Sequence, residues 1–266
     1  MILNDELLKV EEGNVKYLCY KKLNELSVVN AFSLKELNFR NREEIHIDYE
    51  KLLGAMEIPY DRLVKPNQKH TDNILILEQK QNEETADINL DYLESVDAII
   101  TKQKDIAIAT TSADCLCIVL YDMKKHVLAN IHSGWRGTFQ KIAQKTLKKM
   151  KEEFYCNSED ILVFLMPAIR QCHFEVDEDV MLECNRIFKY TGKIEEIIKL
   201  GRKVDGLQKY NINNILINQL ILEEEGILAE NIYDSGICSV CNHDEIHSRR
   251  ADGENFGLGT TVVMMK

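Results

Sequence analysis

Runs of alternating or continuous apolar residues crowd the middle of the chain and predict β-strands. The clearest are NILILE (73–78), DAIIT (97–101), IAIATT (106–111), CLCIVLYD (115–122), HVLANIH (126–132), ILVFLMP (161–167) and TTVVMM (260–265). Weaker strand signals lie between Lys16 and Ser33, and the acidic stretch 79–95 is typical of a solvated loop. Because only residues 123–125 separate CLCIVLYD from HVLANIH, we expect these two runs to form a hairpin.

Four segments have the apolar spacing of a helix. Residues 41–57 place Ile45, Tyr49, Leu52, Leu53 and Met56 on one face, and residues 138–154 do the same with Phe139, Ile142, Ala143, Thr146, Leu147 and Met150. A third helix is predicted from Asp177, a natural N-cap, to Phe188, and a fourth from Asn213 to Glu225, ended by Gly226. Strands and helices alternate irregularly, which predicts a mixed α/β domain and not a doubly wound one.

Composition supports one sizeable domain. The chain has 266 residues, of which 45% are apolar, and this is enough for a substantial core. It has three prolines and no low-complexity stretch that would mark a linker, so we expect a single domain over residues 1–266.

The net charge of −11, with scattered basic residues, argues against a nucleic-acid or acidic-membrane partner. An acidic N-terminal segment and the lack of a long apolar run predict a soluble cytoplasmic protein without a membrane span. In that compartment the eight cysteines are expected to be reduced thiols that serve as core residues, ligands or nucleophiles. The sequence does not indicate an oligomeric state.

The predicted hairpin brings candidate chemistry together. Cys115 and Cys117 share one strand face, Asp114 stands at the start of that strand, and His132 ends its partner. Pairing across the short turn brings Cys115 and His132 close, to within a residue or so of register. A cysteine with a histidine forms either a thiolate nucleophile or a set of zinc ligands.

A glycine-flanked corner, NIHSGWRGT (130–138), follows His132 and holds the only tryptophan of the chain. The chain is expected to turn through Gly134 and Gly137 into a helix whose N-cap is Thr138. Such a turn presents free backbone N–H groups and the positive end of a helix dipole. Arg136 adds a planar fork suited to phosphate or carboxylate, and Trp135 a flat wall for an aromatic ring. The corner therefore predicts a site for a ligand with an anionic end and a planar end.

Plainer interpretations of these residues stay open. A strand cysteine is often only a core residue, Trp135 could simply be buried, and Arg136 could pair with a surface acid. His70, in the loop KPNQKHTDN (65–73), would by itself be a surface histidine.

The tail holds two further features. The segment CSVCNHDEIH offers Cys238, Cys241, His243 and His247, but a structural zinc ribbon needs a second, separated ligand pair, so zinc is the less favoured interpretation. HSRR (247–250) is a basic spot that could hold an anion or form a solvated turn.

Taken in order, these motifs resemble the YfiH family, first described as laccase-like polyphenol oxidases and now as purine nucleoside phosphorylases with adenosine deaminase and methylthioadenosine phosphorylase activity. The resemblance covers most of the chain beyond residue 60. It rests on NQKHTD (67–72), the strand block ending in ADC, ANIHSGWRGT (129–138), PAIRQCHFEV (167–176) and CSVC with HSRRADG in the tail.

The resemblance implies a metal, usually zinc and less often copper, held by His70, Cys115 and His132. Two histidines and one thiolate leave a fourth position open, as in catalytic zinc sites. The substrates implied are a purine nucleoside and phosphate, and the binding residues implied are Gln68, Trp135, Arg136 and Arg250. The family fold is a single-domain α+β fold, a mixed β-sandwich with helices on both outer faces (α/β/β/α layers).

The chain departs from the family pattern at several positions. Asn30 stands where the family has histidine, Lys35 stands at or near an expected arginine, and the glycine-rich loop around residues 30–41 is shortened. Leu258 replaces an arginine in the tail, and Met166 replaces a glycine. These changes put the substrate in more doubt than the metal ligands.

In the hypothesis that follows, the metal or the Cys115 region polarises bound water or phosphate, Asp114 orients His132 or accepts a proton, and Arg136 holds the oxyanion. Three alternatives remain. The first is a cysteine hydrolase with Cys115 as nucleophile and His132 as base. The second is a copper oxidase, which the seven histidines and the lack of a His-x-His pair disfavour. The third is a non-catalytic cell-wall quality-control factor.

Overall fold

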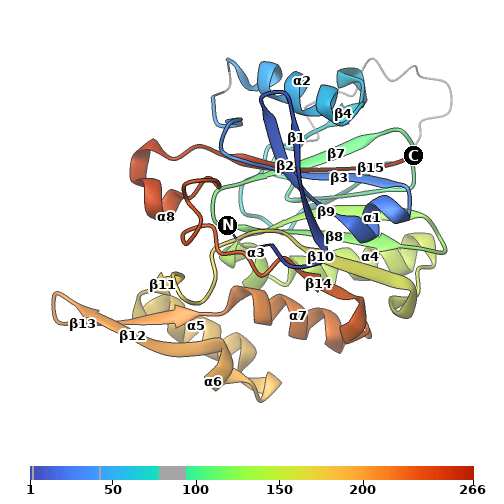
Figure 1. Cartoon of the computed structure of the whole chain (residues 1–266). Coiled ribbons are helices and arrows are strands. Elements are labelled where there is room, and N and C mark those ends of the chain that lie inside the picture. The colour runs from blue at the N-terminus through green and yellow to red at the C-terminus, as the bar shows by residue number, and fades with distance from the viewer. Residues whose placement is uncertain (2, 42, 78–93) are drawn as a thin grey trace.

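Two six-stranded sheets lie face to face at the centre of the molecule (Figure 1). The computed structural model describes residues 1, 3–41, 43–77 and 94–266. The first sheet has the order β1 (Leu7–Glu12), β2 (Val15–Tyr20), β3 (Val28–Ser33), β15 (Gly259–Met265), β7 (Ala107–Ser112) and β4 (Leu63–Val64). The second has the order β14 (Ile232–Asp234), β10 (Ile161–Leu165), β8 (Leu116–Asp122), β9 (Val127–Ser133), β6 (Ala98–Thr101) and β5 (Ile74–Leu77).

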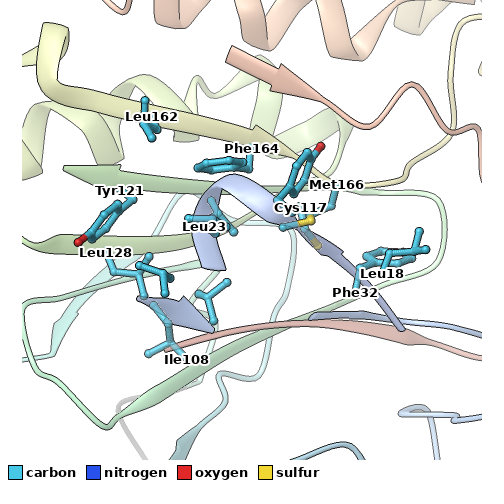
Figure 2. Packing of buried hydrophobic residues seen from close by; sticks show 14 of the residues in the cluster. Leu18, Leu23, Phe32, Ile108, Cys117, Tyr121, Leu128, Leu162, Phe164 and Met166 are labelled. Carbon is cyan, nitrogen blue, oxygen red and sulfur yellow. The ribbon is translucent and has the colours of Figure 1, made fainter. Parts of the chain in front are cut away.

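The main core fills the space between these sheets. Phe32 and Ile108 from the first sheet pack with Cys117, Tyr121 and Phe164 from the second (Figure 2). Each large apolar side chain buried in this way stabilises the fold by about 1.5–3 kcal/mol relative to an exposed one. Because the central strands β8, β9, β10 and β15 are buried on both faces, they are apolar over most of their length.

Helices cover the outer faces of the sandwich. The described residues form the helices α1 (Lys21–Glu25), α2 (Ile45–Ala55), α3 (Trp135–Phe139), α4 (Ile142–Phe154), α5 (Glu178–Phe188), α6 (Ile194–Ile197), α7 (Asn214–Glu224) and α8 (Arg249–Asp252). Of these, α2, α4 and α7 lie on the outer faces, whereas Leu23 of α1 packs in the core between the sheets. Tyr49 and Leu52 of α2 pack against the outer face of the first sheet. Leu147 of α4 and Leu222 of α7 pack against the outer face of the second. The order helix, sheet, sheet, helix confirms the predicted mixed α+β sandwich.

A smaller layer lies below the second sheet in Figure 1. It contains α5, α6 and a third sheet with the order β11 (Glu175–Val176), β13 (Leu207–Ile212) and β12 (Ile198–Val204). Its apolar cluster includes Phe188 and Ile212, and it also takes in Phe139 of α3, with Trp135 packed against it. The corner that follows β9 therefore joins the sandwich to this layer.

The predicted strands and all four predicted helices are confirmed, with ends shifted by a few residues. The helix predicted over 138–154 begins at Ile142, as α4, and the prediction of Thr138 as its N-cap is wrong. Gly134 is the N-cap of the short α3, and Lys141 adopts the left-handed conformation (φ 59°), which ends α3 before α4 begins. Residues 79–93 of the predicted acidic loop lie outside the described residues.

The two predicted N-caps differ in what their side chains do. Asn213 caps α7 as predicted, because its side chain accepts a hydrogen bond from the backbone N–H of Leu216. Asp177 occupies the N-cap position of α5, but its carboxylate pairs with Lys209 and makes no cap hydrogen bond. At the other end of α7, Gly226 adopts φ 93°, which suits the predicted helix stop.

Candidate metal site

Three potential metal ligands from separate segments meet at one end of the second sheet. His70 lies in the loop before β5, Cys115 directly precedes β8, and His132 lies near the end of β9. One ligand atom from each lies within 4.8 Å of the others, and His70 Nε2 is 3.7 Å from Cys115 Sγ. His70 adopts φ 59°, a left-handed conformation uncommon outside glycine, so the loop holds it at some cost in backbone strain.

The β8–β9 hairpin forms as predicted and fixes two of these ligands. Its register sets Cys117 opposite His132 and Leu116 opposite Ser133, so Cys115 lies two residues from direct pairing with His132. Cys117 points into the core between the sheets, whereas Leu116 packs on the helix side. The alternation along the strand therefore aims Cys115 and Cys117 to the same face, as expected.

A buried carboxylate, Asp97, organises the two histidines. Its Oδ1 accepts a 2.8 Å hydrogen bond from His132 Nδ1, which leaves Nε2 of that ring as the ligand atom. The same carboxylate accepts hydrogen bonds from the backbone N–H groups of Lys69, His70 and Thr71, at 3.2, 3.1 and 2.7 Å. Asp97 therefore sets both the tautomer of one histidine and the path of the loop that carries the other.

Sequence reasoning missed Asp97 and expected Asp114 to orient His132. The missed signal is an acid directly before the apolar strand AIIT, since β6 pairs with β9 and Ala98 lies opposite Ile131. A prediction of that pairing would have set Asp97 beside His132. Asp97 is completely buried, and a buried carboxylate needs a dedicated partner.

Charges in the site are matched to one another. Burial opposes ionisation of Asp97, but hydrogen bonds from His132 and Thr71 outweigh it and lower its pKa to about 2. Burial also opposes ionisation of Cys115, but the rings of His132 and His70 lower its pKa to about 6. Burial disfavours the charged ring of His132, whereas Cys115 and Asp97 raise its pKa to about 10. A thiolate held beside a carboxylate-bound histidine is suited to a divalent cation, which can take the place of the proton.

Gly134 gives the ligands room to converge. A Cβ atom at this position would lie 3.0 Å from Cys115 Sγ and 3.0 Å from His70 Cδ2. The backbone of Gly134 is extended (φ −62°, ψ 169°), a conformation open to any residue. Space, and not backbone conformation, is therefore the reason for glycine at this corner.

Trp135 and Arg136 lie directly after that glycine. The Trp135 ring is half-buried and packs edge-on against Phe139, with ring centroids 5.3 Å apart. The exposed guanidinium of Arg136 lies over the tryptophan ring, 4.3 Å from its centroid. Among the described residues, the guanidinium of Arg136 has no hydrogen-bond partner. A stacked cation of this kind beside an aromatic surface suits an anionic group attached to a flat ring.

The other predicted binding residues make structural contacts. The amide of Gln68 forms hydrogen bonds with the backbone and hydroxyl of Thr111, which anchors the loop before His70. The guanidinium of Arg250 donates to the backbone carbonyls of His173 and Glu175. Both residues therefore support the walls of the site.

Asp114 holds the C-terminal tail against the start of β8. Its carboxylate accepts hydrogen bonds from Ser239 Oγ, Ser248 Oγ and the backbone N–H of Arg250, at 2.6, 2.7 and 2.7 Å. It adopts φ 83°, which is uncommon for an aspartate, directly before Cys115. Asp114 thus links the tail to the backbone that positions the thiol.

Three residues that depart from the family pattern make structural contacts away from the three metal ligands. Asn30 is buried in the first sheet, where its side chain bonds the backbone of Tyr20 in both directions. Lys35 pairs with Asp252 at 2.9 Å, and Leu258 packs beside the cluster under α2.

A second group of potential ligands exists within the described residues, and it contains Cys172, His173, Cys238 and Cys241. The tail cysteines therefore meet an upstream Cys-His pair and not the histidines next to them in sequence. His243 lies near Asp252, and His247 Nε2 bonds the carbonyl of Leu37. Judged from the sequence alone, the candidate ligands in this region come from the tail only. In the structure the earlier segment PAIRQCHFEV (167–176) supplies the second, separated pair, Cys172 and His173.

No helix among the described residues is both long enough and apolar enough to span a membrane.

Comparisons with known proteins identify the family of this chain and its fold. The model of the family described as multi-copper polyphenol oxidoreductase laccase matches residues 30–266. A purine nucleoside phosphorylase of Bacteroides thetaiotaomicron is 30% identical over 80% of this chain and 76% of its own length. An adenosine deaminase named RL5, from an unknown prokaryotic organism, is 31% identical over 89% of each chain. The crystal structure of the YfiH protein of Bacillus licheniformis shares the fold, with a TM-score of 0.83 at 19% identity, covering 97% of this chain and 99% of that one. The chain belongs to the multi-copper polyphenol oxidoreductase laccase family.

Proposed function

We propose that this member of the multi-copper polyphenol oxidoreductase laccase family is a purine nucleoside phosphorylase, with adenosine deaminase and methylthioadenosine phosphorylase activity at the same site. The observation that carries the proposal is the convergence of His70, Cys115 and His132, with Asp97 behind them, next to an exposed arginine stacked on tryptophan. Relatives with the names purine nucleoside phosphorylase and adenosine deaminase support it.

Zinc is the metal that we propose for this site. One thiolate and two imidazoles form a donor set that zinc accepts, and three protein ligands leave one position open, as catalytic zinc sites do. Copper also accepts these donors, but repeated histidine pairs are lacking in this chain. When bound, the metal supplies a Lewis acid that polarises an oxygen of water or phosphate.

The protein residues have separate roles in the proposed reaction. His70, Cys115 and His132 hold the metal, and Asp97 keeps the His132 ring fixed in one tautomer. Arg136 binds phosphate, and Trp135 contacts the purine. In phosphorolysis an oxygen of phosphate forms a bond with the anomeric carbon of ribose, the bond to the purine nitrogen breaks, and that nitrogen takes up a proton. In deamination water adds at the purine carbon that bears the amino group, and ammonia leaves.

Asp114, Gln68 and Arg250 complete the proposed site. Gln68 anchors the His70 loop, while Asp114 and Arg250 hold the tail beside Cys115. Asp114 thus positions the thiol through the backbone. The site is proposed to work in the cytoplasm, because all eight cysteines are free and a reducing compartment keeps them so.

A cysteine hydrolase is the second candidate function. The observation that favours it is the lowered pKa of Cys115, about 6, next to His132. A thiolate with a histidine neighbour and a buried carboxylate behind that histidine also fits a nucleophile, a base and an orienting group. Iodoacetamide labelling distinguishes the two: protection of Cys115 by zinc supports the metal site, and labelling with burst kinetics supports the nucleophile.

The decisive experiment is product analysis by mass spectrometry. Purified protein of known metal content is incubated with adenosine, inosine or methylthioadenosine, with and without phosphate. We expect free base and ribose-1-phosphate (or its methylthio form) only when phosphate is present, and inosine from adenosine without it. Cys115→Ser should lower turnover by at least about two orders of magnitude, because loss of a ligand should cost more than loss of a partner behind a ligand, which costs about 10- to 100-fold.

Cys117→Ala is the matched control for this variant. Cys117 lies two residues away on the same strand face but faces the core and not the metal. It should retain metal and turnover. Product formation by Cys115→Ser at the wild-type rate would refute the proposed mechanism. A protein that binds metal but converts none of these nucleosides would point to a different substrate, or to the non-catalytic role.

A further inference from the structure

Four side chains from two separate segments of the sequence form a compact cluster of sulfur and nitrogen atoms outside the first site. Cys172 and His173 come from the segment between β10 and β11, and Cys238 and Cys241 come from the tail after β14. The sulfur of Cys172 lies 3.7 Å from that of Cys238 and 3.9 Å from that of Cys241. Nδ1 of His173 lies 3.2, 3.6 and 3.4 Å from the sulfurs of Cys172, Cys238 and Cys241.

These separations have the dimensions of a tetrahedral zinc site. Zinc lies about 2.3 Å from sulfur and about 2.0–2.1 Å from nitrogen, which sets the sulfurs of a regular tetrahedron about 3.8 Å apart and each sulfur about 3.6 Å from the nitrogen. The two measured sulfur–sulfur distances and the three sulfur–nitrogen distances scatter around these values by a few tenths of an ångström. One ion can therefore reach all four ligand atoms without a rearrangement of the chain.

The surroundings of Cys238 are also those of a metal thiolate. Burial opposes ionisation of this thiol, but the nearby backbone N–H groups of Cys241, Arg170 and Val240 favour the thiolate and lower its pKa. Cys238 lies on an isolated β-bridge to Ala168, so the two ligand-bearing segments are already joined by backbone pairing. The Cys-x-x-Cys spacing places both tail thiols on one turn.

We propose that Cys172, His173, Cys238 and Cys241 bind a second zinc ion, in a closed structural site of the Cys3His type. Four protein ligands fill the tetrahedron, so this ion has no open position for a substrate.

The second ion would stabilise the contacts between the tail and the residues next to the first site. Ser239, next to Cys238, donates its hydroxyl hydrogen to Asp114, the neighbour of Cys115. The guanidinium of Arg250 bonds the backbone carbonyl of His173. Zinc bound between the two segments would hold these contacts in place and stabilise the tail against local unfolding.

A disulfide is the competing use of these cysteines. A disulfide needs sulfurs about 2.05 Å apart, whereas Cys172 and Cys238 hold theirs at 3.7 Å, and all eight cysteines are free thiols. A pair of cysteines explains neither the third thiol nor the imidazole that completes the cluster. The whole set of four is explained by a metal.

The test is a zinc count in full-length protein that lacks the first site. In the double variant Cys115→Ser/His132→Ala, purified from zinc-supplemented medium, we expect one zinc per chain by elemental mass spectrometry. The further change Cys241→Ser, or His173→Ala, should remove most of it. His243→Ala is the matched control, because His243 is close to Cys241 in sequence but outside the cluster, and it should keep one zinc per chain.

Cobalt spectroscopy covers the case in which the triple variants do not fold. Co²⁺ added to the metal-free double variant should give the visible bands of a tetrahedral ion and thiolate charge-transfer absorption, and an equivalent of Zn²⁺ should abolish both. A double variant without zinc and without these bands would overturn the proposal. So would a thiol titration of denatured protein that finds two of the seven remaining thiols in a disulfide.

Discussion

At the scale of single residues, the candidate metal site depends on an absent side chain. Gly134 has an extended backbone and would tolerate alanine, but an alanine Cβ would press on Cys115 Sγ and on the His70 ring at 3.0 Å each. We expect Gly134→Ala to weaken metal binding by about 10- to 100-fold, a loss typical of changes beside metal ligands. Metal titration of the apoprotein measures this effect.

Gly54→Ala is the control for that substitution. Gly54 lies inside α2, and a Cβ there would meet no atom within 4 Å. Metal affinity should stay unchanged, and stability should rise by up to about 1 kcal/mol, because alanine favours a helix. Equal metal affinity in Gly134→Ala and wild type would contradict the steric argument.

Asp97 should make stability depend on pH in acid. Its folded pKa of about 2 lies below the ordinary value of 3.8, so the ionised form stabilises the fold, and this stabilisation is present above about pH 4 and lost as the pH falls toward 2. The difference corresponds to about 2 kcal/mol in metal-free protein. Asp97→Asn should therefore lower the free energy of unfolding at pH 7 by at least about 2 kcal/mol, and the deficit should shrink between pH 4 and pH 2. Urea titrations across that range measure it.

The exposed carboxylate of Asp105 supplies the comparison for Asp97→Asn. Asp105 lies in the connection between β6 and β7, so Asp105→Asn keeps the change of charge but leaves the buried hydrogen bonds intact. We expect its stability to follow that of wild type at each pH, within about 0.5 kcal/mol. A deficit in Asp97→Asn that stays constant from pH 7 to pH 2 would contradict the assigned pKa.

The residues of the first site differ in how well their positions can be predicted from the sequence. The proximity of Cys115 and His132 can be predicted from the sequence, because a short turn joins the two strands that carry them and side chains alternate along each strand. The place of Asp97 cannot, because its partner lies on a strand 35 residues away and the pairing of β6 with β9 has no local signal. His70 was linked to the site only by resemblance.

At the scale of elements, α7 holds the corner that carries the site. The amide of Asn218 bonds the hydroxyls of Ser133 and Thr138, both at 3.1 Å, and all three residues are completely buried. This network lies on either side of Gly134 in the sequence and connects it to the helix layer. It also explains why Thr138 is not an N-cap: its hydroxyl serves the network and not the start of a helix.

Asn218→Leu should therefore disturb both stability and the site. Leucine keeps the volume but leaves the hydroxyls of Ser133 and Thr138 short of a partner in a dry core, at a cost of about 2–3 kcal/mol. We expect weaker metal binding as well, because the corner loses the two hydrogen bonds that connect it to α7. Gln219→Leu on the same helix is half-buried and serves as the control. Thermal unfolding and metal titration measure the two effects, and wild-type stability in Asn218→Leu would contradict the role of the network.

The limits of prediction at the element scale have physical causes. Continuous apolar runs mark strands such as β8 and β10, because both faces of these strands are buried and almost every position is constrained. The break between α3 and α4 has no such mark, since Lys141 is a good helix former and nothing in its sequence signals the left-handed conformation that it adopts. The Cys172–His173 pair was missed as a ligand source because tail and pair meet only in the folded chain.

At the scale of the whole molecule, strands from the first and last parts of the chain pair in one sheet. The last strand, β15, lies between β3 and β7 in the first sheet, so residues near both ends share one core. Contacts of high sequence separation of this kind make partial unfolding of the sandwich costly. The fold was predictable in class from strand and helix patterns, but the central place of β15 was not, because sheet order depends on pairing over more than 200 residues.

We propose, as the sequence suggested, that residues 1–266 form a single domain, and its unfolding tests this. Trp135 is the only tryptophan and packs against the cluster of the lower layer, so its fluorescence reports on α5 and the third sheet. Far-UV circular dichroism is dominated by the two large sheets and the longer helices. If the chain is one domain, both signals should change with the same urea midpoint and slope. A tryptophan transition at clearly lower urea concentration would instead show that the smaller layer, with α5, α6 and the third sheet, unfolds independently. The corner that joins this layer to the metal site would then be the hinge between two domains.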